Sequence, residues 1–227
     1  MNKIIAFGDS IVRGVITDPF RKGRYTVSDG DFVSLCGEYL DRETLNFGKF
    51  GSTIESGETI VDRHLTQIGR GDTVLLEWGG NDCSFNWREI TAKPGSVHNP
   101  LTPLSEYRSR YASIIAKLRS VGAKPVLLSL PPVYPDRFIA HIMRGMSIFK
   151  KISLLRWMGN TDCINGWHEF YNLEVFKTGS ALGVPVLDIT SAFLKRCDYQ
   201  SLLCTDGIHP NEEGHALIAD IICKAGI

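Results

Sequence analysis

The chain has 227 residues, of which 43% are hydrophobic, so it is long enough to bury a core and has an ordinary size for one α/β domain. Lysine and arginine together number 25, as do aspartate and glutamate, which gives a formal net charge of zero. A neutral chain lacks the excess positive charge of a general nucleic-acid-binding protein, so we expect no nucleic-acid partner.

The N-terminal segment is apolar only over residues 4–7 before a turn. A secretory leader has a longer apolar stretch and a cleavage site, and a membrane-spanning helix is longer still. We therefore expect a cytoplasmic protein without stable membrane insertion. The six cysteines contain no C-x-x-C pair, which favours reduced thiols over a zinc site or a disulfide framework. The sequence leaves the oligomeric state open.

Five short apolar runs are predicted to be strands, and several are nearly continuous in valine, isoleucine and leucine, which is typical of strands buried on both faces of a parallel sheet. They cover residues 3–7, 44–47, 73–78, 125–130 and 185–189. Segments with helical spacing lie between them. The apolar helix positions are Phe32, Leu35, Cys36, Tyr39 and Leu40, then Tyr107, Tyr111, Ile114, Ile115 and Leu118, and finally Ala216, Leu217, Ile221 and Ile222 in a helix that begins near Asn211. This alternation predicts one domain over residues 1–227, a three-layer α/β/α sandwich that binds ligands beyond the carboxyl ends of its strands.

Two loops follow the first two predicted strands. Gly8-Asp9-Ser10 comes after the first strand, where a serine hydroxyl can attack a carbonyl group if a base takes its proton. The second strand leads into residues 46–53, where two glycines suit a loop whose backbone approaches another group closely. Each loop alone is also compatible with an ordinary turn, with Ser52 or Thr53 as a helix cap in the second.

Two further loops carry an amide, a carboxylate and an imidazole. Asn81, in Gly79-Gly80-Asn81-Asp82, could donate to a developing oxyanion or belong to an Asn-Asp turn. Asp206 and His209 are three residues apart, so the carboxylate can fold back on one ring nitrogen and leave the other free to serve a serine. Individually these signals are weak. Together the four loops supply a nucleophile, oxyanion donors, a base and an orienting acid at one sheet edge, which predicts acyl-transfer chemistry.

These loops resemble the four conserved blocks of the SGNH hydrolase family. The first block matches at Gly8-Asp9-Ser10, although it continues as Ile11-Val12-Arg13-Gly14 rather than with the commonest residues. The others match at Asn46, Gly48, Gly51 and Thr53, at Gly79-Gly80-Asn81-Asp82, and at Asp206 and His209 followed by Pro210 and Gly214. The matched blocks run from residue 8 to residue 215 and so cover almost the whole chain.

The resemblance implies a flavodoxin-like sandwich with a five-stranded parallel central sheet and the hydrolysis of carboxylic esters or related acyl bonds. Ser10, His209 and Asp206 would form the catalytic triad and an acyl-enzyme intermediate. The backbone N–H groups of Ser10 and Gly51 and the amide of Asn81 would form the oxyanion hole. The resemblance also implies a small-molecule acyl ester as substrate and no metal or organic cofactor.

Four other polar residues near these motifs are expected to have structural rather than catalytic roles. His215 falls inside the last predicted helix, where a capping or surface role is favoured over catalysis. Asp188 could orient His209 if Asp206 did not, but a role as a helix cap before Ser191 is favoured. Asp9 and Asp82 are expected to brace their loops by hydrogen bonds.

Two long insertions are expected to select the substrate. Residues 83–103 contain Trp87, and residues 131–167 contain Trp167 and an apolar stretch interleaved with basic residues. The second insertion is either a lid that covers an acyl chain or attracts an anionic headgroup, or a helix on the core with a solvated basic face; the latter is favoured.

Four alternative functions remain. A carbohydrate O-deacetylase would use Trp87 or Trp167 to stack on a sugar ring, and an acyltransferase would use the same acyl-enzyme while excluding water. A catalytically silent binding or scaffold protein would keep the fold without the reaction. A phosphate-binding protein would use the glycine loops at helix starts, but the sequence lacks a Walker-type lysine.

Overall fold

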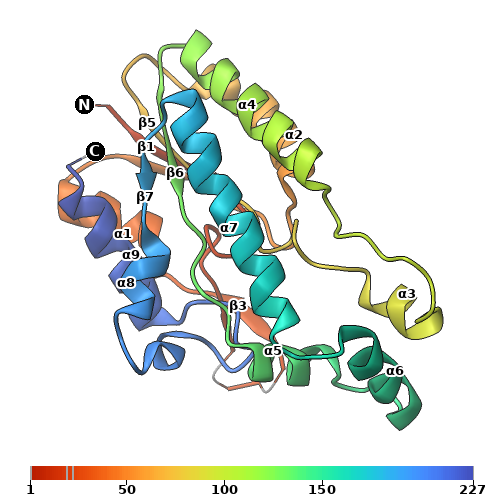
Figure 1. The fold of residues 1–227 in the computed structure, drawn as a ribbon. Helices are drawn as coiled ribbons and strands as arrows, with labels where there is room; N and C mark the ends of the chain where they lie inside the picture. The colour runs from red at the N-terminus through yellow and green to blue at the C-terminus, as the bar shows by residue number, and fades with distance from the viewer. Residues whose placement is uncertain (1, 19, 22, 227) are drawn as a thin grey trace.

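The computed structural model describes residues 2–18, 20–21 and 23–226. Its centre is a five-stranded sheet in the order β4-β1-β5-β6-β7, in which every neighbouring pair is parallel (Figure 1). The strands are β1 (Ile4–Gly8), β4 (Thr44–Asn46), β5 (Thr73–Glu77), β6 (Lys124–Leu128) and β7 (Val186–Leu187). Each strand overlaps one of the five predicted runs, so the predicted parallel sheet is confirmed, although the last strand is shorter than predicted.

Helices cover both faces of this sheet, as the predicted three-layer sandwich requires (Figure 1). One layer contains α2 (Ile54–His64), α4 (Leu104–Ser120) and α7 (Cys163–Leu182), and the other contains α1 (Phe32–Leu40), α8 (Ile189–Leu194) and α9 (Glu212–Lys224). Alternate residues of a strand point to opposite faces. Accordingly, Ile5 and Phe7 pack with the first layer, and Ile4 and Ala6 pack with the second. Burial of each large apolar side chain contributes about 1.5–3 kcal/mol to this arrangement.

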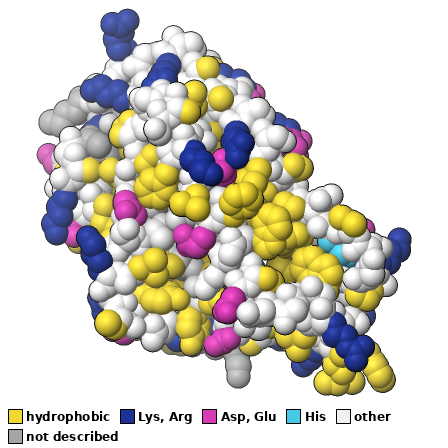
Figure 2. All heavy atoms as spheres, in the orientation of Figure 1, with side chains coloured by type: hydrophobic (Ala, Val, Ile, Leu, Met, Phe, Trp, Pro, Cys, Tyr) yellow, Lys and Arg dark blue, Asp and Glu magenta, His cyan; other side chains and the backbone are white. Residues whose placement is uncertain are grey.

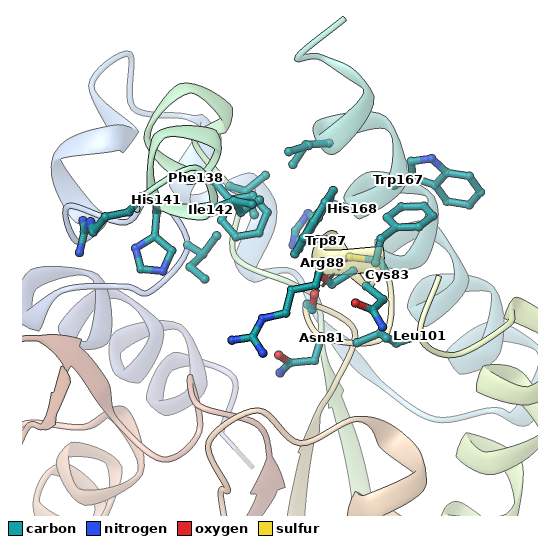
Figure 3. A pocket seen from close by; sticks show the side chains of 18 of the residues that line it. Asn81, Cys83, Trp87, Arg88, Leu101, Phe138, His141, Ile142, Trp167 and His168 are labelled. Carbon is teal, nitrogen blue, oxygen red and sulfur yellow. Dashed lines mark hydrogen bonds between the residues drawn. The ribbon is translucent and has the colours of Figure 1, made fainter. Parts of the chain in front are cut away.

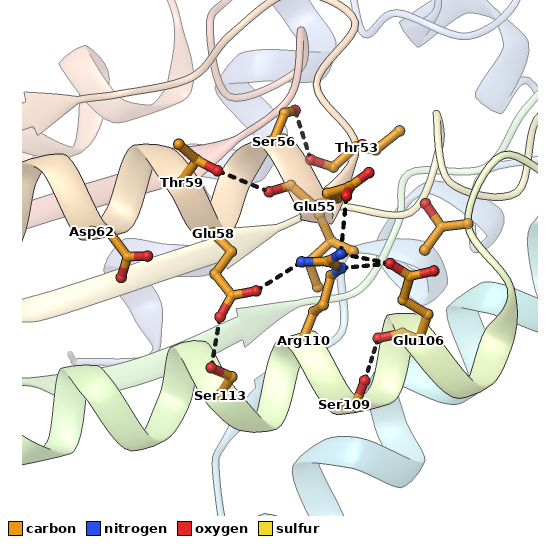
Figure 4. A network of polar contacts seen from close by, with 12 residues as sticks. Thr53, Glu55, Ser56, Glu58, Thr59, Asp62, Glu106, Ser109, Arg110 and Ser113 are labelled. Carbon is orange, nitrogen blue, oxygen red and sulfur yellow. Dashed lines mark hydrogen bonds and ion pairs between the residues drawn. The ribbon is translucent and has the colours of Figure 1, made fainter.

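An ion-pair network also joins α2 to α4 within the first layer (Figure 4). The guanidinium of Arg110 contacts Glu55 and Glu58 of α2 at 3.0 Å each and Glu106 of its own helix at 2.6 Å. Lys117 contacts Glu58 at 2.9 Å. Because several charges share partners, this network holds the two helices in register better than isolated surface pairs would.

The smaller elements all lie outside the central sheet. They are the antiparallel hairpin of β2 (Val15–Thr17) and β3 (Tyr25–Val27), the helices α3 (Trp87–Ala92), α5 (Pro135–Ile142) and α6 (Ile148–Met158), and the short 3-10 helices η1 (Leu65–Gln67) and η2 (Tyr199–Leu202). The hairpin was not predicted, because strands of three residues are too short to show a periodic pattern.

The predicted helix of residues 131–167 on the core is wrong. The segment forms α5, α6 and the start of α7 instead, and its apolar residues join a separate cluster with α3 from the first insertion. On the outer side of α6, Ile148 and Phe149 are exposed next to Lys150, and Figure 2 shows hydrophobic and basic side chains together at this end of the molecule. Across the described residues, no helix combines the length and apolar character that a bilayer crossing requires.

Most predicted helix faces agree with the observed burial. Tyr107, Tyr111, Ile114, Ile115 and Leu118 are all buried in α4. Asn211 begins α9 as predicted, because its side chain accepts a hydrogen bond of 3.0 Å from the Gly214 N–H group. Two assignments are wrong, because Tyr39 of α1 is 62% exposed and Ala216 of α9 faces outward.

His215 lies in the core, so its predicted capping or surface role is wrong. The side chain is fully buried between α9 and α1, where its ring stacks on Phe32 with a centroid distance of 6.0 Å. Among the described residues, neither ring nitrogen has a hydrogen-bond partner. Burial lowers the pKa of His215 to about 4, so the ring is neutral at pH 7.

This burial makes the protein less stable in acid. An unfolded histidine has a pKa of about 6.5, so between pH 6.5 and pH 4 the unfolded chain binds a proton that folded His215 excludes. As the pH is lowered from 6.5 to 4, the free energy of unfolding is therefore expected to fall by up to about 3 kcal/mol. Below pH 4, His215 should cause no further loss of stability. Urea unfolding at several pH values would measure the effect. His215→Met should flatten the dependence, and an equal slope in both proteins would contradict the assignment.

Candidate active site

The turn after β1 places Ser10 at the carboxyl edge of the sheet. Gly8 is required there, because a Cβ atom on it would lie 2.2 Å from Val12 Cγ2 and 2.4 Å from Glu77 O. Asp9 braces the turn by accepting a hydrogen bond of 2.8 Å from the Ile11 N–H group. Ser10 is thereby held with only 6% of its surface exposed.

Asp206 and His209 lie on a tight turn before α9. Asp206 Oδ1 accepts hydrogen bonds from the N–H groups of Ile208 at 3.1 Å and His209 at 3.2 Å. Gly207 has a φ of 78°, in the left-handed region that favours glycine. The other carboxylate oxygen, Oδ2, lies 2.6 Å from His209 Nδ1. The turn therefore presents the imidazole with one nitrogen already bound.

The second ring nitrogen of His209 meets Ser10. Nε2 lies 2.9 Å from Ser10 Oγ, although the two residues are 199 positions apart in the chain. Because Asp206 accepts the proton of Nδ1, the hydroxyl of Ser10 donates to Nε2, which sets the tautomer of the ring. The three residues, which were predicted from two separate motifs, thus form one continuous line of hydrogen bonds.

The environment keeps Asp206 ionised. Burial alone would raise its pKa, but the hydrogen bond and electrostatic interaction with His209, together with the hydrogen bonds from backbone N–H groups, outweigh burial, and the pKa lies below its usual value. A fixed negative charge at Nδ1 stabilises the imidazolium that forms when Nε2 takes a proton. The alternative acid, Asp188, accepts from the Ser191 N–H group at 2.9 Å and caps α8, as predicted.

Two aromatic rings that the sequence did not reveal enclose His209. Tyr25 of the unpredicted hairpin meets the imidazole edge-on at a centroid distance of 5.2 Å, and Phe50 stacks on it at 6.1 Å. The Tyr25 hydroxyl also lies 3.1 Å from His141 Nε2 of α5. Burial, followed by the nearby Asp206 carboxylate, raises the pKa of Tyr25, so its hydroxyl stays protonated. No local motif marks these residues, because they reach the site through tertiary contacts.

The loop after β4 docks on the Ser10 turn. Asn46 Nδ2 donates to Val12 O at 2.7 Å, and a Cβ atom on Gly48 would lie 2.3 Å from Arg13 N. Gly51 has a φ of 70°. Within the described residues, the backbone N–H groups of Ser10 and Gly51 donate to no protein acceptor. Two of the three predicted oxyanion donors are therefore unpaired, although Phe50 rather than Gly51 lines the adjoining cavity.

Asn81 is differently engaged. Its side-chain nitrogen donates to Asp9 Oδ2 at 3.0 Å and to Ser52 O at 3.2 Å, so both amide hydrogens are occupied. Its neighbour Asp82 accepts from the Ile54 N–H group at 3.0 Å and from the Thr102 hydroxyl at 2.6 Å. Asp9 and Asp82 thus brace their loops as predicted. A role for Asn81 at an oxyanion requires one hydrogen to leave Ser52 O.

A buried acid lies beneath Asp9. Glu77 ends β5 with 1% of its surface exposed, and neither carboxyl oxygen has a hydrogen-bond donor among the described residues. Burial and the adjacent Asp9 carboxylate raise the pKa of Glu77 well above its usual value. A protonated Glu77 can donate to Asp9, which in turn holds Asn81.

A cavity of about 1160 Å³ opens beside Ser10, Asn81 and His209 (Figure 3). Its walls come largely from the two insertions, and both Trp87 and Trp167 line it. Their contact with substrate stays a prediction. In the described part of the chain, no group of three or more histidine, cysteine, aspartate or glutamate side chains is arranged to hold a metal ion.

Sequence comparison gives one family and two curated relatives. The chain matches the model of the GDSL-like Lipase/Acylhydrolase family over residues 6–217. It is 26% identical to the GDSL esterase/lipase CPRD49 of Arabidopsis thaliana, over 98% of this chain and 77% of that protein. It is 23% identical to the GDSL esterase/lipase WDL1 of Oryza sativa subsp. japonica, over 97% of this chain and 75% of that protein.

Comparison with solved structures gives the same fold. A lipase/acylhydrolase from Enterococcus faecalis superposes with a TM-score of 0.68 at 18% identity, covering 99% of this chain and 95% of that one. The acetyl xylan esterase AlAXEase superposes with a TM-score of 0.65 at 21% identity, covering 99% of this chain and 100% of that one. At these identities the likeness concerns the fold.

Proposed function

The chain belongs to the GDSL-like lipase/acylhydrolase family and is a carboxylic-ester hydrolase with the SGNH hydrolase fold, and from this premise we propose that it cleaves its substrate through an acyl-enzyme formed on Ser10. The observation that carries the proposal is the line of hydrogen bonds from Ser10 Oγ to His209 Nε2 and from His209 Nδ1 to Asp206 Oδ2, at 2.9 and 2.6 Å. This arrangement supports a proton path from the nucleophile to the base.

In the proposed reaction, Ser10 Oγ attacks the ester carbonyl while its proton passes to His209 Nε2. The imidazolium, stabilised by Asp206, then protonates the leaving alcohol, and the acyl group stays on Ser10. A water molecule gives one proton to His209 as its oxygen attacks the acyl carbonyl. His209 then returns this proton to Ser10 Oγ as the acid is released, which regenerates the free enzyme.

The oxyanion formed in each step needs hydrogen-bond donors. We assign this role to the backbone N–H groups of Ser10 and Gly51, which are unpaired in the described chain. Asn81 would join them when one amide hydrogen moves from Ser52 O, the longer of its two bonds. Loss of one such donor typically costs about a hundredfold to a thousandfold in rate.

Labelling with a fluorophosphonate probe tests the nucleophile directly. The folded protein should take up one probe molecule on Ser10, identified by mass spectrometry of the labelled peptide, because only an activated serine reacts readily with such a reagent. His209→Ala and urea-denatured protein should both remain unlabelled. Absence of label in the folded protein, or label on another serine, would disprove the proposal.

A carbohydrate O-deacetylase is the second candidate. It is favoured by the two tryptophans in the cavity lining and by the structural likeness to an acetyl xylan esterase. It predicts faster acetate release from acetylated xylo-oligosaccharides than from p-nitrophenyl acetate. No specific observation favours an acyltransferase, and the catalytically silent alternative conflicts with family membership.

A further inference from the structure

Three basic side chains line the cavity that opens at Ser10. Arg88 comes from α3, Arg144 from the turn after α5, and Lys150 from α6, so both insertions contribute. Figure 3 shows the Arg88 side chain extended into the cavity. Within the described residues, these three side chains have no carboxylate or other hydrogen-bond acceptor as partner.

Several basic side chains elsewhere on the protein do have such partners. Arg110 contacts three glutamates between α2 and α4 (Figure 4). Arg108 pairs with Glu174, and Arg137 donates to Gln200 O at 2.7 Å. Other surface cations of the described chain also have no partner; what distinguishes Arg88, Arg144 and Lys150 is that all three line the cavity at Ser10.

The cavity has no acid available to neutralise them. Among its lining residues in the described chain, the one carboxylate is Asp9. That side chain is 2% exposed and already accepts hydrogen bonds from Ile11 and Asn81. The chain as a whole has a formal net charge of zero, whereas the cavity lining carries three basic side chains and one carboxylate. Low-dielectric walls concentrate the field of such an excess charge.

This positive charge extends close to His209. A Cβ atom on Gly23 would lie 2.5 Å from Arg144 Nη1, which places the guanidinium against the turn before β3. Burial lowers the pKa of His141, although Asp206 opposes the shift, and the charge of Arg144 lowers it further. His141 bonds Tyr25, which packs on His209. An anionic group could therefore bind near Arg144 while its ester lies at Ser10.

Part of the cavity wall is aromatic. Phe85 meets Trp157 edge-on at a centroid distance of 5.1 Å and Trp167 at 5.5 Å, and all three line the cavity. Such a surface suits the apolar part of a ligand. The lining as a whole combines an apolar wall with unpaired positive charge.

We propose that the substrate of this site is an ester that carries a negatively charged group, such as a carboxylate or a phosphate, bound by Arg88 with Arg144 and Lys150 nearby. This inference rests on the proposed function, because it concerns the substrate of the same Ser10 site. The charged group belongs to either a small soluble ester or a lipid headgroup, and the common chemistry is a single anion on an apolar body.

A matched pair of esters tests the proposal. Mono-p-nitrophenyl adipate and p-nitrophenyl hexanoate have acyl chains of the same length and differ by one terminal carboxylate. At low salt the wild type should prefer the adipate by about 10–100-fold in kcat/KM, mainly through KM, because hydrogen bonds to charged groups are strong. Arg88→Gln should reduce that preference about tenfold, Arg88→Lys should keep part of it, and added salt should weaken it.

Arg156→Gln is the matched control. Like Arg88→Gln, it removes one positive charge, but from an exposed residue of α6 that does not line the cavity. It should leave the preference for the adipate unchanged. An equal kcat/KM for the two esters in the wild type, or an unchanged preference in Arg88→Gln, would overturn the inference. Hydrolysis of the hexanoate together with labelling of Ser10 would then leave the proposed function standing. If neither ester is cleaved and Ser10 is not labelled, both proposals fail.

An additional assay with phospholipid substrates distinguishes the two possible sources of the anion. Dispersed phosphatidylglycerol and phosphatidylcholine differ in net charge while offering the same ester bonds. Faster cleavage of phosphatidylglycerol, reduced by Arg88→Gln, supports a lipid headgroup as the anion. Preference for the adipate with no cleavage of either lipid supports a small soluble ester.

Discussion

Replacement of Ser10 by alanine is expected to lower kcat for a p-nitrophenyl ester by about 10⁴–10⁶-fold, to the residual level that binding and oxyanion stabilisation alone provide. The physical reason is that the substitution removes the Oγ atom that would carry the acyl group. Initial rates at saturating ester, with the wild type measured in parallel, would give the ratio.

Protein stability provides the control for this variant. The side-chain hydrogen bond of Ser10 is to His209, so the alanine variant should unfold at nearly the same urea concentration as the wild type. Ser191→Ala, which changes an exposed serine of α8, should keep full activity. A Ser10→Ala protein that is folded and retains more than about a hundredth of wild-type kcat would show that another group is the nucleophile.

The sequence predicted the candidate triad because its residues belong to short segments with restricted geometry. Asp206 and His209 are three positions apart on one turn, and their bond follows from local folding. To predict the position of Ser10, it was enough that β1 ends at Gly8, at the same edge of the sheet as the turn with Asp206 and His209. The sheet itself could be predicted because its strands are buried on both faces and therefore read as continuous apolar runs.

The walls around this triad could not be predicted in the same way. Tyr25 reaches His209 through a hairpin of two short strands, and Phe50 reaches it from a glycine-rich loop. Neither position has a periodic or motif signal that distinguishes it from an ordinary loop residue. Contacts between loops depend on how the finished layers place them, so they become visible with the tertiary structure.

His215 differs, because the sequence contained a usable signal. It precedes Ile218, Ala219 and Ile222 by three, four and seven positions, and all four side chains are buried on one face of α9. Helical periodicity would therefore have predicted burial of His215, but a capping or surface role was expected instead. The surface assignment gave too much weight to the polarity of histidine and too little to its position in the helix.

The anchoring of α5 bears on how far residues 131–167 can move as a lid. Tyr134 N donates to Gly207 O at 2.7 Å, and Arg137 donates to Gln200 O at 2.7 Å. The start of α5 is therefore tied to the turn that carries Asp206 and His209. Movement of the start of α5 would therefore disturb the candidate triad. Helix α6 makes neither of these two hydrogen bonds, so it can move as a lid without breaking them.

Asp206→Asn is expected to lower kcat by about 10⁴-fold while leaving the fold intact. The amide oxygen of asparagine can still accept from the N–H groups of Ile208 and His209, so the turn is preserved. Its NH₂ group, however, donates to Nδ1 of His209, which moves the ring proton to Nε2. That nitrogen then faces Ser10 with a hydrogen and cannot take the proton of the nucleophile. Steady-state kinetics on a p-nitrophenyl ester would measure the loss.

Asp188→Asn is the control for Asp206→Asn, because it removes another carboxylate at the same edge of the sheet, but one that does not bind His209. Asp188 was the alternative partner for His209, but it caps α8, and asparagine is an equally good cap. This variant should therefore keep kcat within about twofold, since substitutions outside a functional contact have small effects. Equal losses in the two variants would assign the orienting role to both acids. A full rate in Asp206→Asn would mean that the 2.6 Å contact with Nδ1 does not determine which ring nitrogen carries the proton.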